Sequence, residues 1–183
     1  MGRGQAGFTL LELVLVLAAG VTIASLALPR FNNFMQAQRA RNAARIVERE
    51  LQTARLKAVG SSRSLRVRFN CPAAGQLRIL EVTGVATTDN ATNRCSPAAY
   101  PSPGPSDSLR ATPQYDSPVI QLPTGTSVSA IAMNFEFSPA GNVYAVSASN
   151  VVTTLNGDAT LTVTRGGYSQ TVTINALGRV HIN

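Results

Sequence analysis

Residues 8–28 read FTLLELVLVLAAGVTIASLAL, and this stretch decides how the chain is organised. It holds twenty-one residues and one ionisable side chain, that of Glu12. Because a helix rises about 1.5 Å per residue, the segment would be about 31 Å long, enough to cross a hydrocarbon core of about 30 Å. The apolar region of a cleaved signal peptide is shorter, about 7–15 residues. The stretch therefore predicts a single membrane-spanning helix.

The composition of the whole chain narrows its possible functions. The chain has 183 residues, of which 44% are hydrophobic and 14% charged. This size predicts one or two domains, and the composition excludes an acidic disordered tail, a collagen-like repeat and a disulfide-dense mini-protein. Two cysteines (Cys71 and Cys95), one histidine (His181) and scattered acids leave little material for a metal site or a catalytic group. We expect that the protein is not an enzyme and that it binds no metal, no cofactor and no small-molecule substrate.

Glu12 is the unusual residue of the apolar stretch. On insertion scales a charged group at the bilayer centre costs about 2.5–3.5 kcal/mol, so such a residue usually has a partner or a function. Two interpretations are open from the stretch alone. Either the carboxylate reaches the membrane interface and has no role, or it pairs with a cation.

The residues around Glu12 favour the second interpretation. Gly7-Phe8-Thr9-Leu10-Leu11-Glu12, followed by the apolar run, resembles the prepilin processing site of the type IV pilin superfamily. The resemblance implies that a prepilin peptidase cuts between Gly7 and Phe8 on the cytoplasmic side and methylates the new N-terminus of Phe8. Pro29 falls where such pilins commonly carry a helix-kinking proline, and we expect it to bend or interrupt the helix.

Cleavage after Gly7 would create an amine that is mostly protonated at neutral pH. This ammonium and the Glu12 carboxylate cannot easily satisfy each other within one helix, but they can pair between neighbouring subunits of a helical bundle. Such a pair would repay part of the desolvation of both groups and would set the register of the subunits. Glu12 and Pro29 are therefore the predicted assembly residues.

Two other features bear on orientation and processing. One basic residue, Arg3, precedes the stretch, and three follow it, Arg30, Arg39 and Arg41. This count would place the N-terminus outside the cell, whereas the processing-site resemblance places it in the cytoplasm. The competing interpretation is an ordinary secreted β-rich protein whose signal peptide is cut after the small residues 25–27. Glu12 and the single basic residue at the start argue against that alternative.

Residues 30–59 lack Pro and Gly and have apolar residues at a spacing of three to four. They predict an amphipathic helix that continues the first helix into a globular head and ends at Gly60 in a left-handed C-cap. The chain carries a net charge of +7, but residues 30–68 alone carry ten basic and two acidic residues, a net of +8. The basic stretch is either a solvated helix face or a surface attracted to anionic lipids or acidic neighbours.

After Gly60 the apolar pattern changes to a period of two, which is typical of half-buried strands. We expect an α+β fold in which one antiparallel sheet packs on the helix. Gly166 and Gly167 predict a tight hairpin, and residues 83–117 predict a long loop, the least ordered part of the head. The expected strands are 65–69, 77–82, 119–122, 128–131, 135–137, 143–146, 160–164, 170–174 and 179–182. The expected organisation is a leader (1–7), a transmembrane and assembly helix (8–29), an amphipathic helix (30–60) and a head (61–183).

Cys71 and Cys95 flank part of the predicted loop. If the head lies outside the cytoplasmic membrane, a disulfide between them is the natural interpretation. Two buried thiols are the alternative.

The C-terminal residues 160–183 sharpen the resemblance. The Thr-rich hairpin and the ending Leu177-Gly178-Arg179-Val180-His181-Ile182 resemble the GspH/FimT branch of pseudopilins and minor pilins. The resemblance implies a minor subunit of a type II secretion pseudopilus or a type IV pilus. Its partners would be other pilin subunits, the prepilin peptidase and the inner-membrane assembly platform. The chain would cross the inner membrane once, with its head in the periplasm, and would later enter the filament at the cell surface.

The same resemblance carries a second function, capture of DNA by a FimT-like minor pilin. Some members of that branch bind DNA through a C-terminal Gly-Arg-x-Arg element, which here reads Gly178-Arg179-Val180-His181. Arg165 in the hairpin is a candidate for a further phosphate contact. Because residues 69–183 carry five basic and six acidic residues, a net of −1, the head lacks the excess of positive charge that a DNA-binding surface needs.

Overall fold

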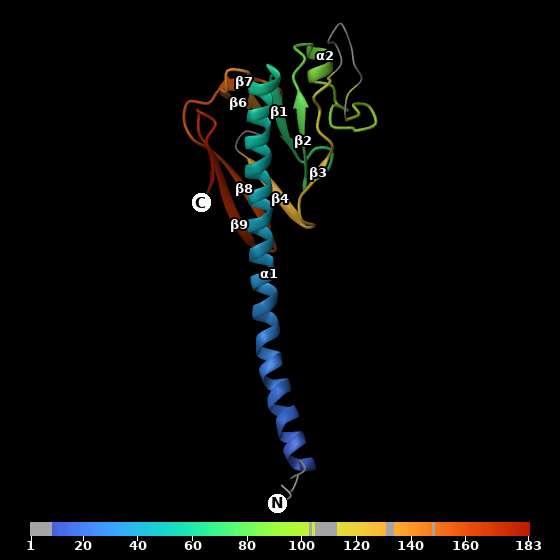
Figure 1. Cartoon of the computed structure of the whole chain (residues 1–183), viewed down its shortest axis with the longest axis vertical. Coiled ribbons are helices and arrows are strands. Elements are labelled where there is room, and N and C mark those ends of the chain that lie inside the picture. Colours follow the sequence, from blue (N-terminus) through green and yellow to red (C-terminus); the bar gives the residue numbers. More distant parts are fainter. Residues whose placement is uncertain (1–8, 103, 105–112, 131–133, 148) are drawn as a thin grey trace, which may run out of the picture. The chain divides into compact units, whose positions relative to one another are not determined.

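The computed structural model describes residues 9–102, 104, 113–130, 134–147 and 149–183 (Figure 1). The chain forms two compact units, Met1–Gln36 and Ala37–Asn183. Helix α1 (Leu10–Ser61) contributes to both units and is 52 residues long. Its backbone stays helical through Pro29, so the expected interruption of the helix does not occur there.

The C-terminal end of α1 differs from the sequence prediction. The residue in the left-handed conformation is Ser62, with φ of 55°, whereas Gly60 is still helical. The N–H of Arg63 donates to the carbonyl of Ala58 (3.1 Å) and the N–H of Ser62 to that of Val59 (3.3 Å). This is the Schellman arrangement, with serine in the place where glycine is usual. The prediction of a cap at Gly60 was wrong because the head holds two more residues in the helix.

The head contains two antiparallel sheets instead of the single expected sheet. The larger sheet has the order β3-β2-β1-β5-β6-β7, and the smaller has the order β10-β9-β8-β4. The strands of the larger sheet are β1 (Leu65–Phe69), β2 (Gln76–Glu81), β3 (Ile120–Gln121), β5 (Asn134–Phe137), β6 (Val143–Val146) and β7 (Val152–Thr154). Those of the smaller sheet are β4 (Thr126–Ala130), β8 (Ala159–Arg165), β9 (Tyr168–Ile174) and β10 (Val180–Ile182). The α+β class is confirmed. Of the nine expected strands, β1 and β6 have the predicted bounds, and the other seven are present with shifted ends.

The hairpin between β8 and β9 forms as the glycines predict. Arg165 pairs with Tyr168, and the two residues between them, Gly166 and Gly167, have φ of 55° and 84°. Two positive φ values in succession are the requirement of the tight turn that matches the twist of the strands. Strand β7 was not expected, since its three residues are exposed and show no alternation.

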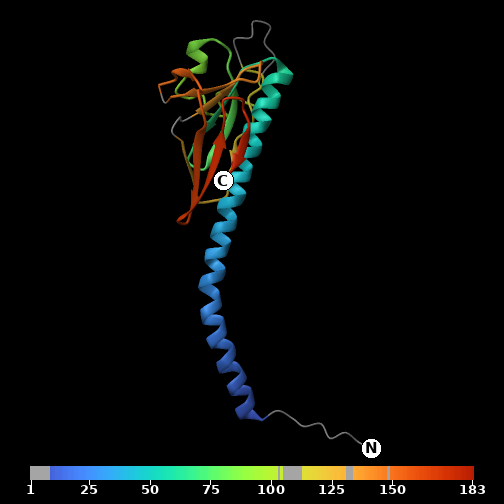
Figure 2. The ribbon, with the colours of Figure 1, turned by 90° about the vertical axis from the view of Figure 1, so that its left-hand side faces the viewer.

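One hydrophobic core joins the second half of α1 to both sheets (Figure 2). The residues that α1 contributes are mostly small, and all are fully buried: Ala43, Ala44, Val47, Leu51, Ala54 and Ala58. They meet the larger sheet at residues such as Phe135 and Phe137, and the smaller sheet at residues such as Leu161 and Val172. Most of these α1 residues are alanines, so the helix contributes small side chains to the core.

The described part of residues 83–117 is more structured than the composition predicts. It contains helix α2 (Ala86–Asp89) and three buried charged residues, Asp89, Arg94 and Asp116. A disulfide between Cys71 and Cys95, with Cα atoms 5.3 Å apart, ties the segment to the end of β1 and confirms the expected pairing. Residues 103 and 105–112 of this segment lie outside the described residues.

Candidate functional site

The N-terminus of α1 is built around Thr9. Its hydroxyl oxygen accepts a hydrogen bond of 3.2 Å from the backbone N–H of Glu12, and its carbonyl accepts one from Leu13. The spacing Thr9-x-x-Glu12 is that of a capping box, a signal that the sequence analysis missed. Glu12 is exposed in the first helical turn, where the helix dipole stabilises a carboxylate. Gly7 and Phe8, the predicted processing residues, lie outside the described residues.

The first half of α1 exposes apolar side chains on all sides. Five consecutive residues, 13–17, are each more than half exposed, and five consecutive residues go around the helix completely. The large apolar residues that are 55–82% exposed are Leu10, Leu11, Leu13, Val14, Leu15, Val16, Leu17, Val21, Ile23, Leu28, Phe31 and Phe34. In the described part of the chain, α1 alone is long and apolar enough to cross a membrane. Such a surface is compatible with a cover of lipid or of neighbouring helices.

The three predicted DNA-binding residues do not form one site. His181 and Arg179 lie at alternate positions near β10, whose residue Val180 pairs with Ile174 at the C-terminal end of β9. Arg165 pairs with Tyr168 at the other end of β9, six residues away, or about 20 Å along a strand. The residue that the fold brings next to Gly178 and Arg179 is Arg55 of α1, which lines the same cleft. No local sequence signal links Arg55 to residues more than a hundred positions away.

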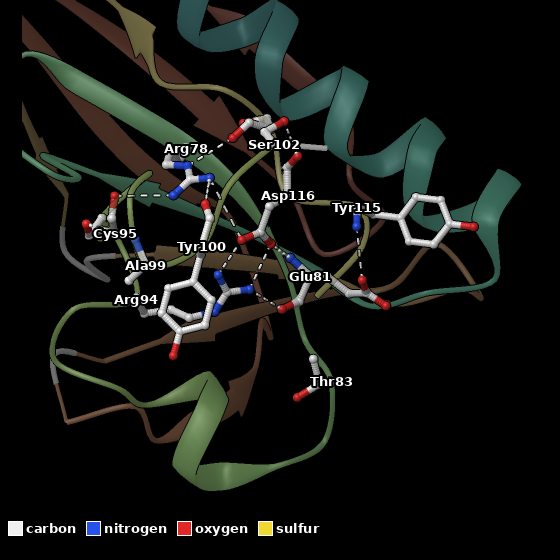
Figure 3. Close-up of polar contacts among 12 residues, drawn as sticks. Arg78, Glu81, Thr83, Arg94, Cys95, Ala99, Tyr100, Ser102, Tyr115 and Asp116 are labelled. Carbon is white, nitrogen blue, oxygen red and sulfur yellow. Dashed lines mark hydrogen bonds and ion pairs between the residues drawn. The ribbon is translucent and has the colours of Figure 1, made fainter. Parts of the chain in front are cut away.

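A cluster of buried charges anchors the segment after β2 (Figure 3). Arg94 binds both carboxylate oxygens of Asp116, and its guanidinium also donates to the carbonyl of Glu81 at 2.9 Å. The ring of Tyr100 lies 4.5 Å from the Arg94 guanidinium carbon, close enough for a cation–π interaction. Asp116 in turn accepts a hydrogen bond of 2.8 Å from the backbone N–H of Glu81.

Arg78, in β2, completes this cluster. Its guanidinium donates to the carbonyls of Ser117 (2.9 Å), Tyr100 (2.8 Å) and Cys95 (3.3 Å). Burial lowers the pKa of Arg78, and the carboxylate of Asp116, 3.9 Å away, counteracts this. Each of the three guanidinium nitrogens therefore donates a hydrogen bond inside the head. We interpret the cluster as structural, because its charges face one another and not solvent.

A second group of polar side chains lies on β1. Arg66 forms a buried ion pair with Glu136 at 2.9 Å, and Arg66 and Arg68 both donate to the side-chain oxygen of Asn150. Burial is the main cause that lowers the pKa of Arg68, and the positive charge of Arg66 adds to it. The bonds among these residues are internal to the head, so this group also has a structural role.

Among the described residues, no group of three or more His, Cys, Asp or Glu side chains is placed to hold a metal ion. His181 is exposed on the edge strand β10. No hydrogen bond or ion pair joins its side chain to a carboxylate of the described residues. Two of the surfaces that the described residues offer to a partner are the apolar half of α1 and the cleft beside Arg55.

No protein-family model matches the sequence, and no curated protein matches it either. Among solved structures, the type IV minor pilin FimU of Pseudomonas aeruginosa is similar at 14% identity and a TM-score of 0.47, over 82% of this chain and 92% of that one. The minor pseudopilin EpsH of the type 2 secretion system of Vibrio cholerae is similar at 16% identity and a TM-score of 0.45, over 79% and 95%.

Proposed function

We propose that the chain is a minor subunit of a type IV pilus or of a type II secretion pseudopilus. The observation that carries the proposal is the first half of α1. It combines an apolar surface exposed on all sides with a single carboxylate, Glu12, in the first turn. A lipid bilayer would cover the apolar surface before assembly, and the helices of neighbouring subunits would cover it in a filament.

In this proposal the prepilin peptidase cuts between Gly7 and Phe8 and methylates the amine of Phe8. The ammonium of one subunit then pairs with Glu12 of a neighbour, and this pair fixes the register of the helices. The chain spans the inner membrane once, with its head in the periplasm, until the assembly platform transfers it into the filament. Other pilin or pseudopilin subunits are its partners.

Two measurements test the proposal. Mass spectrometry of the mature N-terminus is expected to find a chain that starts at a methylated Phe8. A chain that still starts at Met1 contradicts the processing step, and a chain cut after Ala27 supports the ordinary signal peptide.

The second measurement is incorporation of Glu12→Ala into sheared surface filaments. We expect its incorporation to fall at least about tenfold, since the buried ammonium of the neighbour loses its partner. Glu48→Ala removes a carboxylate from the same helix outside the apolar half and is expected to assemble normally. The hydrogen bond to the Thr9 hydroxyl comes from the backbone N–H of residue 12, so Glu12→Ala keeps this cap. Undiminished incorporation would overturn the assembly role of Glu12.

DNA capture is the second candidate function. The observation that favours it is the approach of Arg55 to Arg179, which places a second guanidinium near the C-terminal Gly-Arg element. Two or three phosphate contacts predict weak binding that falls steeply with salt. A mobility-shift assay at low salt tests it. A shift that Arg179→Ala removes supports DNA capture, and the lack of any shift at micromolar protein contradicts it.

A further inference from the structure

The surface of the head has a cleft between α1 and the turn before β10. Its volume is about 280 Å³, and it is lined by Gln52, Arg55 and Leu56 of α1 and by Gly178, Arg179 and Val180. All six residues belong to the unit Ala37–Asn183, so the geometry of the cleft is set by the head alone.

Gly178 makes room for Arg55 in this cleft, and a second glycine, Gly141, lies close to the same side chain. Gly178 has φ of +74°, and a Cβ atom there would lie 2.8 Å from Nε and 2.9 Å from Cδ of Arg55. Gly141, in the turn between β5 and β6, has φ of +83°, and a Cβ atom there would lie 3.8 Å from Nη2 of Arg55. The Arg55 side chain therefore passes next to the bare backbone of two turns, which restricts its position before any ligand arrives.

The turn before β10 is also fixed from within. The side-chain oxygen of Asn175 accepts hydrogen bonds from the backbone N–H of Leu177 at 3.0 Å and of Arg179 at 2.9 Å. The backbone N–H of Gly178 donates to the carbonyl of Asn175 at 2.9 Å. Leu177 and Arg179 thus project from a turn whose backbone groups are satisfied locally.

The charge in the cleft is not balanced by the head. Arg49, Arg63, Arg66, Arg78 and Arg94 each form an ion pair with a carboxylate. No hydrogen bond or ion pair joins the side chains of Arg55 or Arg179 to another residue of the described chain. Two arginines and Gln52 line the cleft, and such a set of donors suits an oxyanion, because charge-assisted and bidentate hydrogen bonds are strong.

Aliphatic side chains at the cleft indicate whether the oxyanion is a phosphate of a nucleic acid or a carboxylate of a protein. Leu56, in the cleft, is 73% exposed, and Leu177, next to Gly178, is 70% exposed. Phosphates of a nucleic acid would use the arginines but would leave both leucines in water. A protein segment that carries a carboxylate next to aliphatic side chains would use both, and arginine with exposed apolar groups is typical of protein interfaces.

We infer that the cleft between Arg55 and Arg179 is a docking site for an acidic, aliphatic segment of a partner protein. A carboxylate of the partner binds the two guanidinium groups, and its aliphatic neighbours cover Leu56 and Leu177. The inference depends on the head and not on N-terminal processing, so it stands or falls separately from the proposed filament role.

The test uses the full chain in lipid nanodiscs and a fluorescent peptide of alternating leucine and glutamate as the probe. Fluorescence anisotropy is expected to show binding that weakens at least about tenfold when glutamine replaces glutamate in the peptide. Arg55→Gln and Arg179→Gln are each expected to weaken binding by about the same factor. Arg45→Gln is the matched control, because Arg45 is an exposed arginine of the same helix outside the cleft. The affinity of this variant for the acidic peptide is expected to stay within about twofold of that of the unchanged chain.

Three outcomes would overturn the inference. The first is no binding of the acidic peptide, and the second is equal binding of its glutamine version. The third is equal loss of binding in Arg45→Gln, which would indicate a general attraction to the basic helix. A short DNA duplex is the competitor: if it binds more tightly than the peptide and depends on Arg55 and Arg179, the cleft is a nucleic-acid site instead. Thermal unfolding of each variant checks that the head is intact.

Discussion

The two halves of α1 differ in what they do with apolar residues. In the first half, large residues such as Leu15 are exposed on every side, while in the second half small residues such as Ala44 and Ala54 are fully buried. The difference shows that hydrophobicity alone does not tell which part of a helix belongs to the core. Small residues on one face allow close packing against sheets, whereas large residues around the whole circumference indicate a cover that the chain itself does not provide.

Removal of the first half of α1 tests whether the head folds independently of it. We expect residues 37–183 to fold without the first half, because the core residues among those that the structure describes lie at or after Ala40. The midpoint of thermal unfolding should stay within about 2 °C of that of the head in the full chain. Circular dichroism during heating measures it, and a non-cooperative transition of the shortened chain would show that the first half supports the head.

A leucine in each half provides a matched pair. Leu51 is fully buried and Leu15 is 64% exposed. Leu51→Ala is expected to lower the free energy of unfolding of the head by about 2–5 kcal/mol, since it removes buried atoms and leaves a cavity. Leu15→Ala is expected to change it by less than about 0.5 kcal/mol. Urea unfolding followed by circular dichroism measures both, and equal effects would contradict the division of α1.

The reverse substitution tests the close approach of the helix to the sheets. Ala54→Leu inserts three carbon atoms at a fully buried position and is expected to cost about 1–3 kcal/mol through overpacking. Ala24→Leu makes the same change in the exposed half and is expected to leave unfolding of the head unchanged. The same urea titration applies. If Ala54→Leu has no effect, the contact is looser than the burial of this residue indicates.

The smallest expected effects concern two glycines of the head. Gly60 is helical with open space where a Cβ atom would be, so Gly60→Ala is expected to stabilise the head by about 0.5–1 kcal/mol. Gly178 has φ of +74°, so Gly178→Ala is expected to destabilise it by about 1–2 kcal/mol. Thermal unfolding compares the two. A loss of stability in Gly60→Ala would instead support the sequence prediction of a left-handed C-cap at Gly60.

Local patterns predicted most of the secondary structure. Alternation located β1 and β8, and the pair Gly166-Gly167 located the hairpin, because these signals depend on neighbours within a few residues. The same patterns could not show that the strands divide into two sheets, since pairings such as that of β4 with β8 join residues more than thirty positions apart. The composition of residues 83–117 predicted a poorly ordered loop, but Arg94 and Asp116 of this segment are buried as an ion pair. No local sequence pattern predicts this burial.

The candidate sites divide in the same way. Thr9 and Glu12 are three residues apart, and a helix of any sequence would bring them into one turn. Arg55 and Arg179 are separated by most of the head, and only the packing of α1 against both sheets places them in one cleft.

The sequence by itself determined an apolar helix with one carboxylate, an antiparallel β-rich head and a cysteine pair, because each follows from the local order of residues or from composition. Only the tertiary structure decided the division into two sheets, the left-handed turn at Ser62, the burial of Arg78 and Arg94, and the meeting of Arg55 with Arg179. These features depend on which segments, distant in the sequence, bury apolar surface against one another. The free energy of this burial is a property of the whole folded chain and cannot be assigned to a short stretch of sequence.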